Sequence, residues 1–339
     1  MGLEIGRDLT DTGGQRYVID KPLFNSDEAR TRMGLVYLAH LVETPTQQCA
    51  IKIPNIKPDN SNEHYDRMLR LFQREIFFQK NLGAKGSPFA EFHGEFPDIA
   101  VDDCFGHFFR APGFAMEYLP GRSLDQKNPP LPCEVFEVLK KVLSALAIVH
   151  EQKILLRDLK LEHIIVDGEV AVEQERIVTK DLVVKILDLG LAEDHLLVED
   201  SGYYLAGTAR YLPPELVVGP EGRNHYANPK RDLYAAGVIA YQLLTGRWPI
   251  NGPDHIALMV NKTKQDPMSV GAWQLRKDRT RHPIPPELRD FTMKLLARDP
   301  EKRYRDATEA LAALCNIDET NFIASQVAFD ANAVIEDVT

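Results

Sequence analysis

Cysteine is scarce in this chain, and the few cysteines do not form a metal-binding or disulfide framework. The four cysteines among 339 residues, Cys49, Cys104, Cys133 and Cys315, lie far apart, and none belongs to a CxxC pair. A zinc site with the usual ligand spacing is therefore not expected. A chain of this length can bury a sizeable core without disulfides, and scattered cysteines suit a reducing compartment. We expect a cytoplasmic protein.

Long apolar runs and an excess of positive charge are also missing. No stretch approaches the roughly 18 apolar residues of a membrane-spanning helix. The first residues lack both the basic and the apolar part of a signal peptide. The formal net charge is -10, whereas proteins that bind nucleic acid usually present a basic surface. We therefore expect neither a nucleic-acid partner nor a membrane segment in this chain.

The first third of the chain has mostly the character of β-strands. Residues 35–41, 49–53 and 114–119 are short β-prone runs, and Pro120–Gly121 ends the last of them. Between the second and third runs, apolar residues recur at helical spacing over residues 68–76. This pattern predicts a β-rich part that contains one helix.

The remainder of the chain is predominantly helical. Apolar side chains recur at i, i+3, i+4 and i+7 over residues 135–149, which predicts a long amphipathic helix. Residues 233–244 are apolar nearly all round, which predicts a buried helix, and Gly246 suits its C-terminal end. Residues 288–296 form a later helical face. The sequence thus predicts an α+β protein in which a smaller β-rich part precedes a larger helical part.

A lysine lies within the second β-prone run. Because side chains alternate along a strand, Ala50 and Lys52 share one face of it. Such a lysine usually lies at an edge or on a solvated face. The functional interpretation is a clamp for the phosphates of a nucleotide, which needs an acidic partner, and Glu75 in the helical segment is available. A glutamate in that position is commonly a surface residue, so both interpretations are open at this point.

Two acidic residues adjoin apolar runs later in the chain. Asp158 and Lys160 follow the long helix and precede the β-prone run 164–166, and such charges are costly between apolar runs unless they are paired. Asp188 ends another β-prone run, and Gly190 follows closely. These residues are interpreted either as a charged loop and a simple turn, or as a catalytic base and a metal-binding carboxylate.

Taken together, these residues resemble the signature of the eukaryotic-type Ser/Thr protein kinase family. Lys52, Glu75, Asp158, Asp188 and Gly190 occur in its order and at about its separations. Further matches are Met116–Leu119 with the hinge, Gly207–Glu215 with the end of the activation segment, Asp232 with the anchor of the catalytic loop and Arg303 with the partner of Glu215. The resemblance implies a two-lobed protein-kinase-like fold, with a β-rich N-lobe that contains one main helix and an α-helical C-lobe.

The resemblance also implies how the chain is divided. We expect an N-terminal extension at residues 1–15, a kinase N-lobe at residues 16–119 and a kinase C-lobe at residues 120–315. An acidic tail follows at residues 316–339.

The resemblance implies a role for each matched residue. Asp158 would be the catalytic base, with Lys160 beside the transferred phosphate. Lys52 would hold the phosphates of ATP, Glu75 would orient Lys52, and Asp188 would bind Mg²⁺. The other nucleotide-binding positions that it implies are Gly34, Val36, Ala50, Met116, Glu117, Leu119 and Ile165.

The sequence departs from the family pattern at two functional places. Gly34 matches the third glycine of the glycine-rich loop, but Thr31 and Ala29 replace the first two. Glycine lets a backbone approach phosphate closely, so the loss of two glycines predicts a stiffer or lifted loop.

His163 replaces the asparagine that holds a second Mg²⁺ in the family. An imidazole nitrogen suits Mn²⁺ better than Mg²⁺, so we expect His163 as a metal ligand with Mn²⁺ as an alternative ion. The other interpretation of His163 is a hydrogen-bonding residue of the loop.

The function that the resemblance implies is transfer of the γ-phosphate of ATP to a protein hydroxyl. Lys160 together with Thr208 resembles the Ser/Thr-specific branch of the family. Glu162 occupies a position where related kinases select a basic residue, which favours a basic protein substrate. Two alternatives remain open: a pseudokinase that serves as a nucleotide-binding scaffold or allosteric partner, and a kinase for a small molecule. The sequence indicates no oligomeric state.

Overall fold

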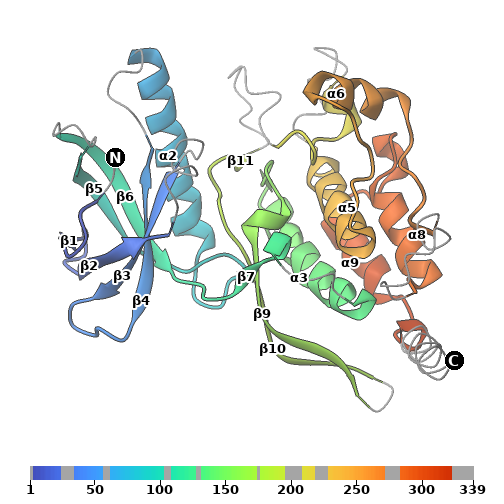
Figure 1. Cartoon of the computed structure of the whole chain (residues 1–339), viewed down its shortest axis with the longest axis horizontal. Coiled ribbons are helices and arrows are strands. Elements are labelled where there is room, and N and C mark those ends of the chain that lie inside the picture. The colour runs from blue at the N-terminus through green and yellow to red at the C-terminus, as the bar shows by residue number, and fades with distance from the viewer. Residues whose placement is uncertain are drawn as a thin grey trace, which may run out of the picture. The chain divides into compact units, whose positions relative to one another are not determined.

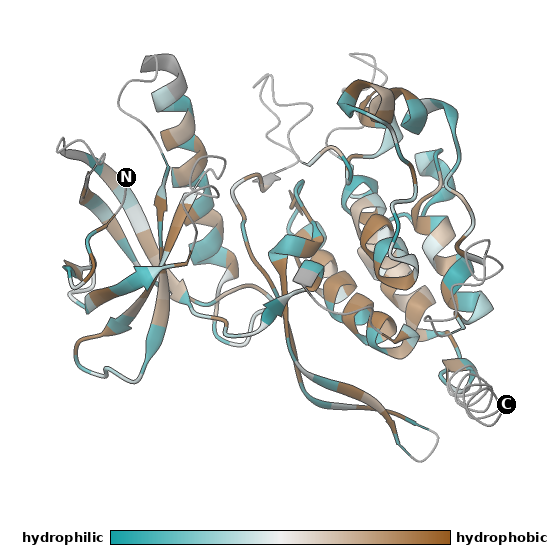
Figure 2. Cartoon of the chain, in the orientation of Figure 1, coloured by the Kyte–Doolittle hydropathy of each residue, from teal (hydrophilic) through white to brown (hydrophobic). Residues whose placement is uncertain are grey.

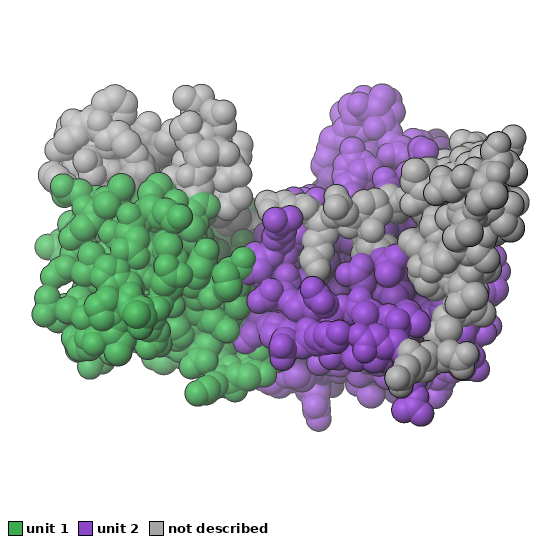
Figure 3. All heavy atoms as spheres, turned by 60° about the horizontal axis from the view of Figure 1, so that its bottom comes forward, with its two compact units in different colours: residues 1–120, 187–190 green, residues 121–186, 191–339 purple. Residues whose placement is uncertain are grey.

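The chain is organised as two compact units (Figure 3). The computed structural model describes residues 3–23, 34–55, 62–102, 108–126, 131–173, 176–194, 208–217, 228–271 and 283–322. Unit 1 comprises residues 1–120 and 187–190, and unit 2 comprises residues 121–186 and 191–339. The first boundary therefore falls at Pro120–Gly121, the two residues that end the predicted β-prone run 114–119.

Unit 1 is built on a six-stranded antiparallel sheet with the strand order β1-β2-β3-β4-β6-β5 (Figure 1). Its elements are β1 (Asp8–Thr10), β2 (Arg16–Pro22), β3 (Gly34–Leu41), β4 (Gln48–Pro54), helix α2 (Asn62–Leu82), β5 (Phe92–Asp102) and β6 (Phe108–Glu117). The three predicted strands are confirmed as β3, β4 and β6, and the predicted helix as α2. Helix α2 packs against β4, β5 and β6.

The first residues of the chain belong to the core of this sheet. Strand β1 pairs with β2, and Leu3 and Leu9 are buried in the same apolar cluster as the inner residues of β2, β3 and β4. The backbone N–H of Leu3 donates to the hydroxyl of Tyr37 at 3.0 Å. Residues 1–15, which the sequence analysis sets apart as an extension, thus contribute a strand and two core side chains to unit 1.

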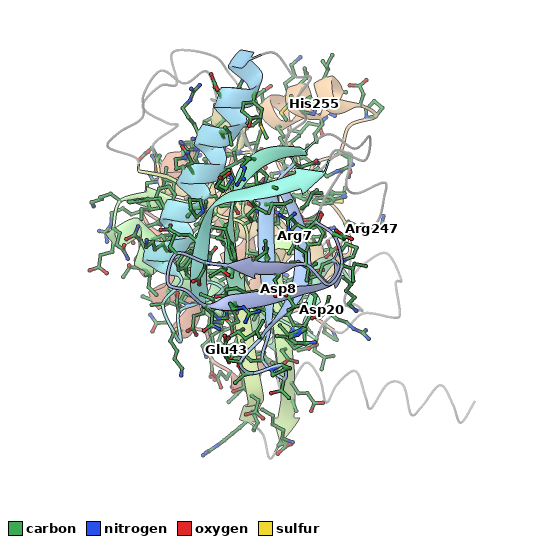
Figure 4. The ribbon with its side chains drawn as sticks, turned by 90° about the vertical axis from the view of Figure 1, so that its left-hand side faces the viewer. Arg7, Asp8, Asp20, Glu43, Arg247 and His255 are labelled. Atoms are coloured by element: carbon green, nitrogen blue, oxygen red, sulfur yellow. The ribbon has the colours of Figure 1, made fainter. Side chains whose placement is uncertain are left out.

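Charged residues lie on and next to strands β1, β2 and β3 of unit 1. Figure 4, which turns the left-hand side of Figure 1 toward the viewer, labels four of them: Arg7, Asp8, Asp20 and Glu43. Asp8 forms an ion pair with Arg16 at 2.9 Å, and Asp20 forms one with His40 at 2.7 Å. Because these pairs are at least partly exposed, they contribute little to stability. The buried apolar cluster is therefore what fastens the N-terminal strand.

Unit 2 is predominantly helical, and short 3₁₀ turns interrupt its loops at Leu124–Gln126, Leu161–His163, Pro214–Leu216 and Pro300–Lys302. Its regular elements are β7 (Arg122–Ser123), α3 (Pro132–Glu151), β8 (Ile154–Leu155), β9 (Ile164–Glu173), β10 (Arg176–Ile186), β11 (Glu193–Asp194), α5 (Lys230–Thr245), α6 (His255–Lys264), α8 (Pro286–Leu295) and α9 (Ala307–Cys315). The predicted long, buried and later helices are confirmed as α3, α5 and α8. Gly246 ends α5 with φ 66°, a left-handed conformation that favours glycine.

Helix α3 is the centre of the packing in unit 2. It contacts α5 and α9, and α5 in turn contacts α8. Phe322, which follows α9, is also buried, and its ring lies 4.7 Å from the ring of Phe136 on α3. The acidic segment 316–339 thus begins with residues that pack against helix α3 within unit 2. In the part of the chain that the structure describes, no helix combines the length and the hydropathy needed to cross a bilayer.

Strands β9 and β10 form one long antiparallel hairpin (Figure 1). The predicted β-prone run 164–166 and the predicted run that leads to Asp188 form the base of this hairpin, where residues 164–167 pair with residues 183–186. Hydrophobic residues run along much of the hairpin (Figure 2). Its base joins the sheet β10-β9-β7, and its second strand leads into residues 187–190, which belong to unit 1.

The burial of the N-terminal residues generates a first prediction. Leu9→Ala should lower the free energy of unfolding by about 2–4 kcal/mol, because it opens a cavity in a packed core. Ile5→Ala is the matched control, since Ile5 is 65% exposed, and it should change stability by less than about 0.5 kcal/mol. Chemical denaturation measures both values, and equal effects of the two variants would contradict the packing of this segment.

Candidate active site

Lys52 lies at the centre of the candidate site in unit 1. It comes from β4, pairs with Val36 of β3 and Phe114 of β6, and is buried. A Cβ atom on Gly34 would lie 2.6 Å from Lys52 Cε, so a larger residue there would displace the lysine side chain. Glycine at position 34 therefore leaves the space in which Lys52 extends along the sheet.

Two carboxylates hold the ammonium group of Lys52. Its Nζ donates a hydrogen bond to Oε1 of Glu75, a buried residue of α2, and lies 3.4 Å from Oδ1 of Asp188. Burial disfavours the charge of Lys52, but the carboxylates of Asp188 and Glu75 outweigh it and raise the pKa of the lysine. The structure thus brings together three of the predicted site residues around a lysine that stays charged.

Asp188 adopts a backbone conformation that is unusual for a residue with a side chain. Its φ is 63°, and such conformations cost energy and concentrate at functional sites. The N–H of Gly190 donates to Asp188 Oδ1 at 3.1 Å. The Asp188 side chain is 39% exposed, so its carboxylate is bound on one side and accessible to a ligand on the other.

An apolar cluster in unit 1 contains four of the predicted nucleotide-binding residues. Val36, Ala50, Met116 and Leu119 pack together with Phe72 and Phe114, among others. Glu117 follows Met116; its N–H donates to the carbonyl of Glu91 at 2.8 Å, and its carboxylate accepts from the N–H of Glu91 at 3.0 Å. Ile165, the remaining predicted residue, is half-buried on β9 of unit 2. Apolar side chains such as those of the cluster suit contact with an aromatic ring.

A buried carboxylate organises the candidate catalytic loop in unit 2. Asp232, in the first turn of α5, accepts hydrogen bonds from the backbone N–H groups of Leu156 at 2.9 Å and Arg157 at 3.0 Å. His150 Nε2 lies 3.1 Å from Oδ2 of Asp232, the same oxygen that accepts from Leu156. Burial alone would raise the pKa of Asp232, but these donors outweigh burial and lower it. The predicted anchoring of the loop by Asp232 is confirmed.

Asp158 is held in place by residues from two segments. Thr208 donates to Asp158 Oδ1 through its backbone N–H at 2.9 Å and its hydroxyl at 3.0 Å. Lys160 Nζ donates to Asp158 Oδ2 at 2.7 Å and to the Thr208 hydroxyl at 3.2 Å. The predicted trio therefore forms one cluster, in which a carboxylate acceptor and an ammonium donor lie side by side.

His163 contacts the same loop. Its Nδ1 lies 3.1 Å from the carbonyl oxygen of Asp158. A carbonyl only accepts hydrogen bonds, so Nδ1 carries the proton in the neutral ring and Nε2 is the nitrogen suited to a metal. Among the described residues, no group of three or more His, Cys, Asp or Glu side chains forms a metal cage. His163 and Asp188 belong to different units, and their joint use as metal ligands stays a prediction.

The segment 208–217 is fastened at several points beyond Thr208. The Tyr211 hydroxyl accepts from the N–H of Leu161 at 3.3 Å and contacts the Glu162 carboxylate at 3.4 Å. Glu215 pairs with Arg303 through two hydrogen bonds of 2.7 Å each, as the sequence predicted. This bidentate geometry is the strong form of such pairs.

The sequence assigned no role to three residues of this network, although one of them, Tyr211, lies within the matched segment Gly207–Glu215. His150, Tyr211 and Lys262 each contact the catalytic loop, its anchor or the segment 208–217. A signal existed for Lys262, because it follows Leu258 by four residues on α6 and both are buried. The replaced loop glycines, Thr31 and Ala29, lie outside the described residues.

The Glu215–Arg303 pair generates a second prediction. Arg303→Ala should lower the free energy of unfolding by about 3–5 kcal/mol, because it leaves the largely buried carboxylate of Glu215 unpaired. The adjacent Lys302 is exposed, so Lys302→Ala should cost less than about 0.5 kcal/mol. Thermal and chemical denaturation measure both. A loss below 1 kcal/mol for Arg303→Ala would refute the anchoring role of the pair.

Comparisons with known proteins agree with this geometry. Residues 32–314 match the protein kinase domain family. Similar curated proteins include the serine/threonine-protein kinase PrkC of Bacillus subtilis, 26% identical over 90% of this chain and 40% of its own length. Another is PknL of Mycobacterium tuberculosis, 31% identical over 58% of this chain and 45% of its own length. The chain thus spans less than half of the length of these relatives.

A solved structure supports the same fold. The Rad53 kinase domain with SCD2 superposes with a TM-score of 0.59 at 20% identity, over 87% of this chain and 93% of that one. At this identity the likeness concerns the fold alone. The family match covers most of the chain, and the chain therefore belongs to the protein kinase domain family, with its two-lobed α+β fold.

Proposed function

We propose that this chain is an ATP-dependent serine/threonine protein kinase. The observation that carries the proposal is the cluster of Asp158, Lys160 and Thr208. A carboxylate that accepts and an ammonium that donates, 2.7 Å apart, are what the transfer of a phosphoryl group to a hydroxyl requires. The family and the names of its relatives support the same activity.

The residues of unit 1 would hold the nucleotide. The ammonium of Lys52 would contact the phosphates of ATP, and Glu75 would keep it oriented. The apolar cluster of Val36, Ala50, Met116 and Leu119 would contact the adenine, together with Ile165 of unit 2 and the backbone of Glu117. Gly34 would keep the space beside Lys52 open. This assignment rests on a charged lysine held between two carboxylates.

The residues of unit 2 would act on the acceptor. The substrate hydroxyl would donate a hydrogen bond to the Asp158 carboxylate, which orients its oxygen and takes its proton. As the new O–P bond forms, the bond between the γ-phosphorus and the β–γ bridging oxygen of ATP breaks, and ADP leaves with that oxygen. Lys160 would stabilise the negative charge on the phosphoryl group during transfer. Thr208 restrains the rotation of the Asp158 carboxylate, so the acceptor atom has a fixed direction before substrate binds.

The donor atoms fit a divalent metal. Asp188 offers an accessible carboxylate, which suits Mg²⁺, and Mg²⁺ usually takes one or two carboxylates while phosphates and water complete its shell. His163 would add an imidazole nitrogen, which suits Mn²⁺ better than Mg²⁺. When bound, the metal would neutralise phosphate charge.

The proposed substrate is a protein with basic residues near the acceptor hydroxyl. Glu162 is exposed beside the catalytic loop, and the chain as a whole is acidic, with a formal net charge of -10. Both features favour a basic acceptor through long-range attraction.

The proposed location is the cytoplasm. The thiols of Cys49, Cys133 and Cys315 are free, which supports a reducing compartment.

The proposal predicts the effect of removing the base. Asp158→Asn should lower the transfer of labelled phosphate from ATP to a basic protein by about 10²–10⁴-fold, because the amide cannot take the proton. Asp167→Asn, on the exposed part of β9, is the matched control and should keep wild-type activity. The assay is run with Mg²⁺ and with Mn²⁺.

The same assay separates the kinase from a pseudokinase. ATP binding is measured in parallel by calorimetry for the wild type and Asp158→Asn. If the wild type binds ATP but transfers no label with either metal, the chain is a nucleotide-binding scaffold and the proposal is wrong. If both proteins transfer label equally, Asp158 is not the base.

The identity of residue 163 generates a separate prediction about the metal. The wild type should be more active with Mn²⁺ than with Mg²⁺ at matched concentrations. His163→Asn replaces the nitrogen ligand by an oxygen ligand, so the ratio of activity in Mn²⁺ to activity in Mg²⁺ should fall. An unchanged ratio would show that His163 serves only as a hydrogen-bonding residue of the loop.

A further inference from the structure

Helix α6 carries a lysine in a position where helices usually bury an apolar residue. Lys262 is 1% exposed, and it lies one turn after the buried Leu258. Its Nζ donates hydrogen bonds to the carbonyl oxygens of Arg210 at 2.9 Å and Leu212 at 2.6 Å. A buried amine is costly unless it is hydrogen-bonded, and these two carbonyls of the segment 208–217 provide the bonds.

The surroundings of Lys262 favour a hydrogen-bonding role over an ion pair. Its Nζ lies 5.2 Å from the centre of the Tyr234 ring, and the Arg303 guanidinium lies 4.9 Å from the centre of that same ring. Burial, followed by the nearby Arg210 guanidinium, lowers the pKa of Lys262 to about 7. A neutral amine still has two N–H groups, so both carbonyls are satisfied in either protonation state.

The two carbonyls flank the residue that touches the catalytic loop. Tyr211 lies between Arg210 and Leu212, and its hydroxyl contacts Leu161 and Glu162. Lys262 therefore fixes both peptide groups around Tyr211 from one side, while the loop holds the tyrosine side chain from the other. Thr208, bound to Asp158, precedes this clamped stretch, and Glu215, bound to Arg303, follows it.

We propose that Lys262 is a positioning residue that holds residues 210–212 in the orientation in which the segment receives a protein substrate. This inference rests on the proposed function: Thr208 of the segment 208–217 bonds to the candidate base Asp158, so a protein substrate whose hydroxyl reaches Asp158 would lie against this segment. Lys262 is bonded to that segment through Arg210 and Leu212, and its described hydrogen bonds do not reach Asp158. It therefore sets the affinity for the peptide and not the affinity for ATP.

Two neutral variants of similar size test the proposal. Lys262→Met removes every donor and leaves both carbonyls unpaired, whereas Lys262→Gln keeps an NH₂ group. With a basic serine peptide, Lys262→Met should raise the KM for the peptide about tenfold, as expected when two buried acceptors lose their donor. Lys262→Gln should restore part of that loss, and the KM for ATP should stay unchanged in both. Lys264→Met, at an exposed position of the same helix, is the control and should match the wild type.

Amide hydrogen exchange provides a readout that needs no activity. Exchange of the residues 208–217 should be faster in Lys262→Met than in Lys262→Gln or the wild type, while exchange in α3 and α5 stays slow and confirms that the variants are folded. If residues 208–217 exchange at the wild-type rate in Lys262→Met, Lys262 does not hold this segment in place. A parallel rise in the KM for peptide and the KM for ATP, or equal effects of Met and Gln, would overturn the positioning role.

The two proposals fail in different ways. If the wild type transfers phosphate and Lys262→Met keeps the wild-type KM for the peptide, the inference about Lys262 is wrong and the kinase function stands. If the wild type transfers no phosphate to any peptide, the proposed function is wrong, and hydrogen exchange alone decides whether Lys262 clamps the segment.

Discussion

The arrangement of unit 2 depends on the buried carboxylate of Asp232. A charge with 1% exposure is tolerable only because two backbone N–H groups and His150 surround it. Those same N–H groups belong to Leu156 and Arg157, and Arg157 has φ 67°, which a loop adopts only under constraint. The residue that follows is Asp158. Helix α5, which is among the best-packed elements of the unit, thus determines where the candidate base lies.

The segment 208–217 is fixed by bonds to Asp158 and to other residues of unit 2. Thr208 binds the aspartate, Lys262 of α6 holds the peptides around Tyr211, and Arg303 holds Glu215. Each of these bonds joins residues at least 50 positions apart in the sequence. A segment whose regular structure is one short 3₁₀ turn, Pro214–Leu216, is therefore positioned by side chains from three distant parts of unit 2. Small changes in any of them are expected to alter the position of the base.

The periodicity of apolar residues predicted the main helices and several strands of the fold. Strand β4 with Lys52, helix α3 and helix α5 follow from alternation and from the 3.6-residue repeat. The site residues required the resemblance in addition, because no periodicity distinguishes Asp158 from any other charged loop residue. The N-terminal strand and the buried Phe322 were not predicted, since their packing partners, such as Tyr37 and Phe136, are remote in sequence. Lys262 follows Leu258 at helical spacing, but that spacing could not identify its partners, which are two backbone carbonyls at least 50 positions away in the sequence.

In the proposed function, the cluster of Asp158, Lys160 and Thr208 delivers phosphate to the hydroxyl of serine or threonine. The most direct test is phosphoamino-acid analysis of a mixed basic protein substrate after incubation of the chain with ATP labelled at the γ-phosphate. The account predicts label in phosphoserine and phosphothreonine and none in phosphotyrosine. Label confined to tyrosine, or found only in small molecules, would contradict it.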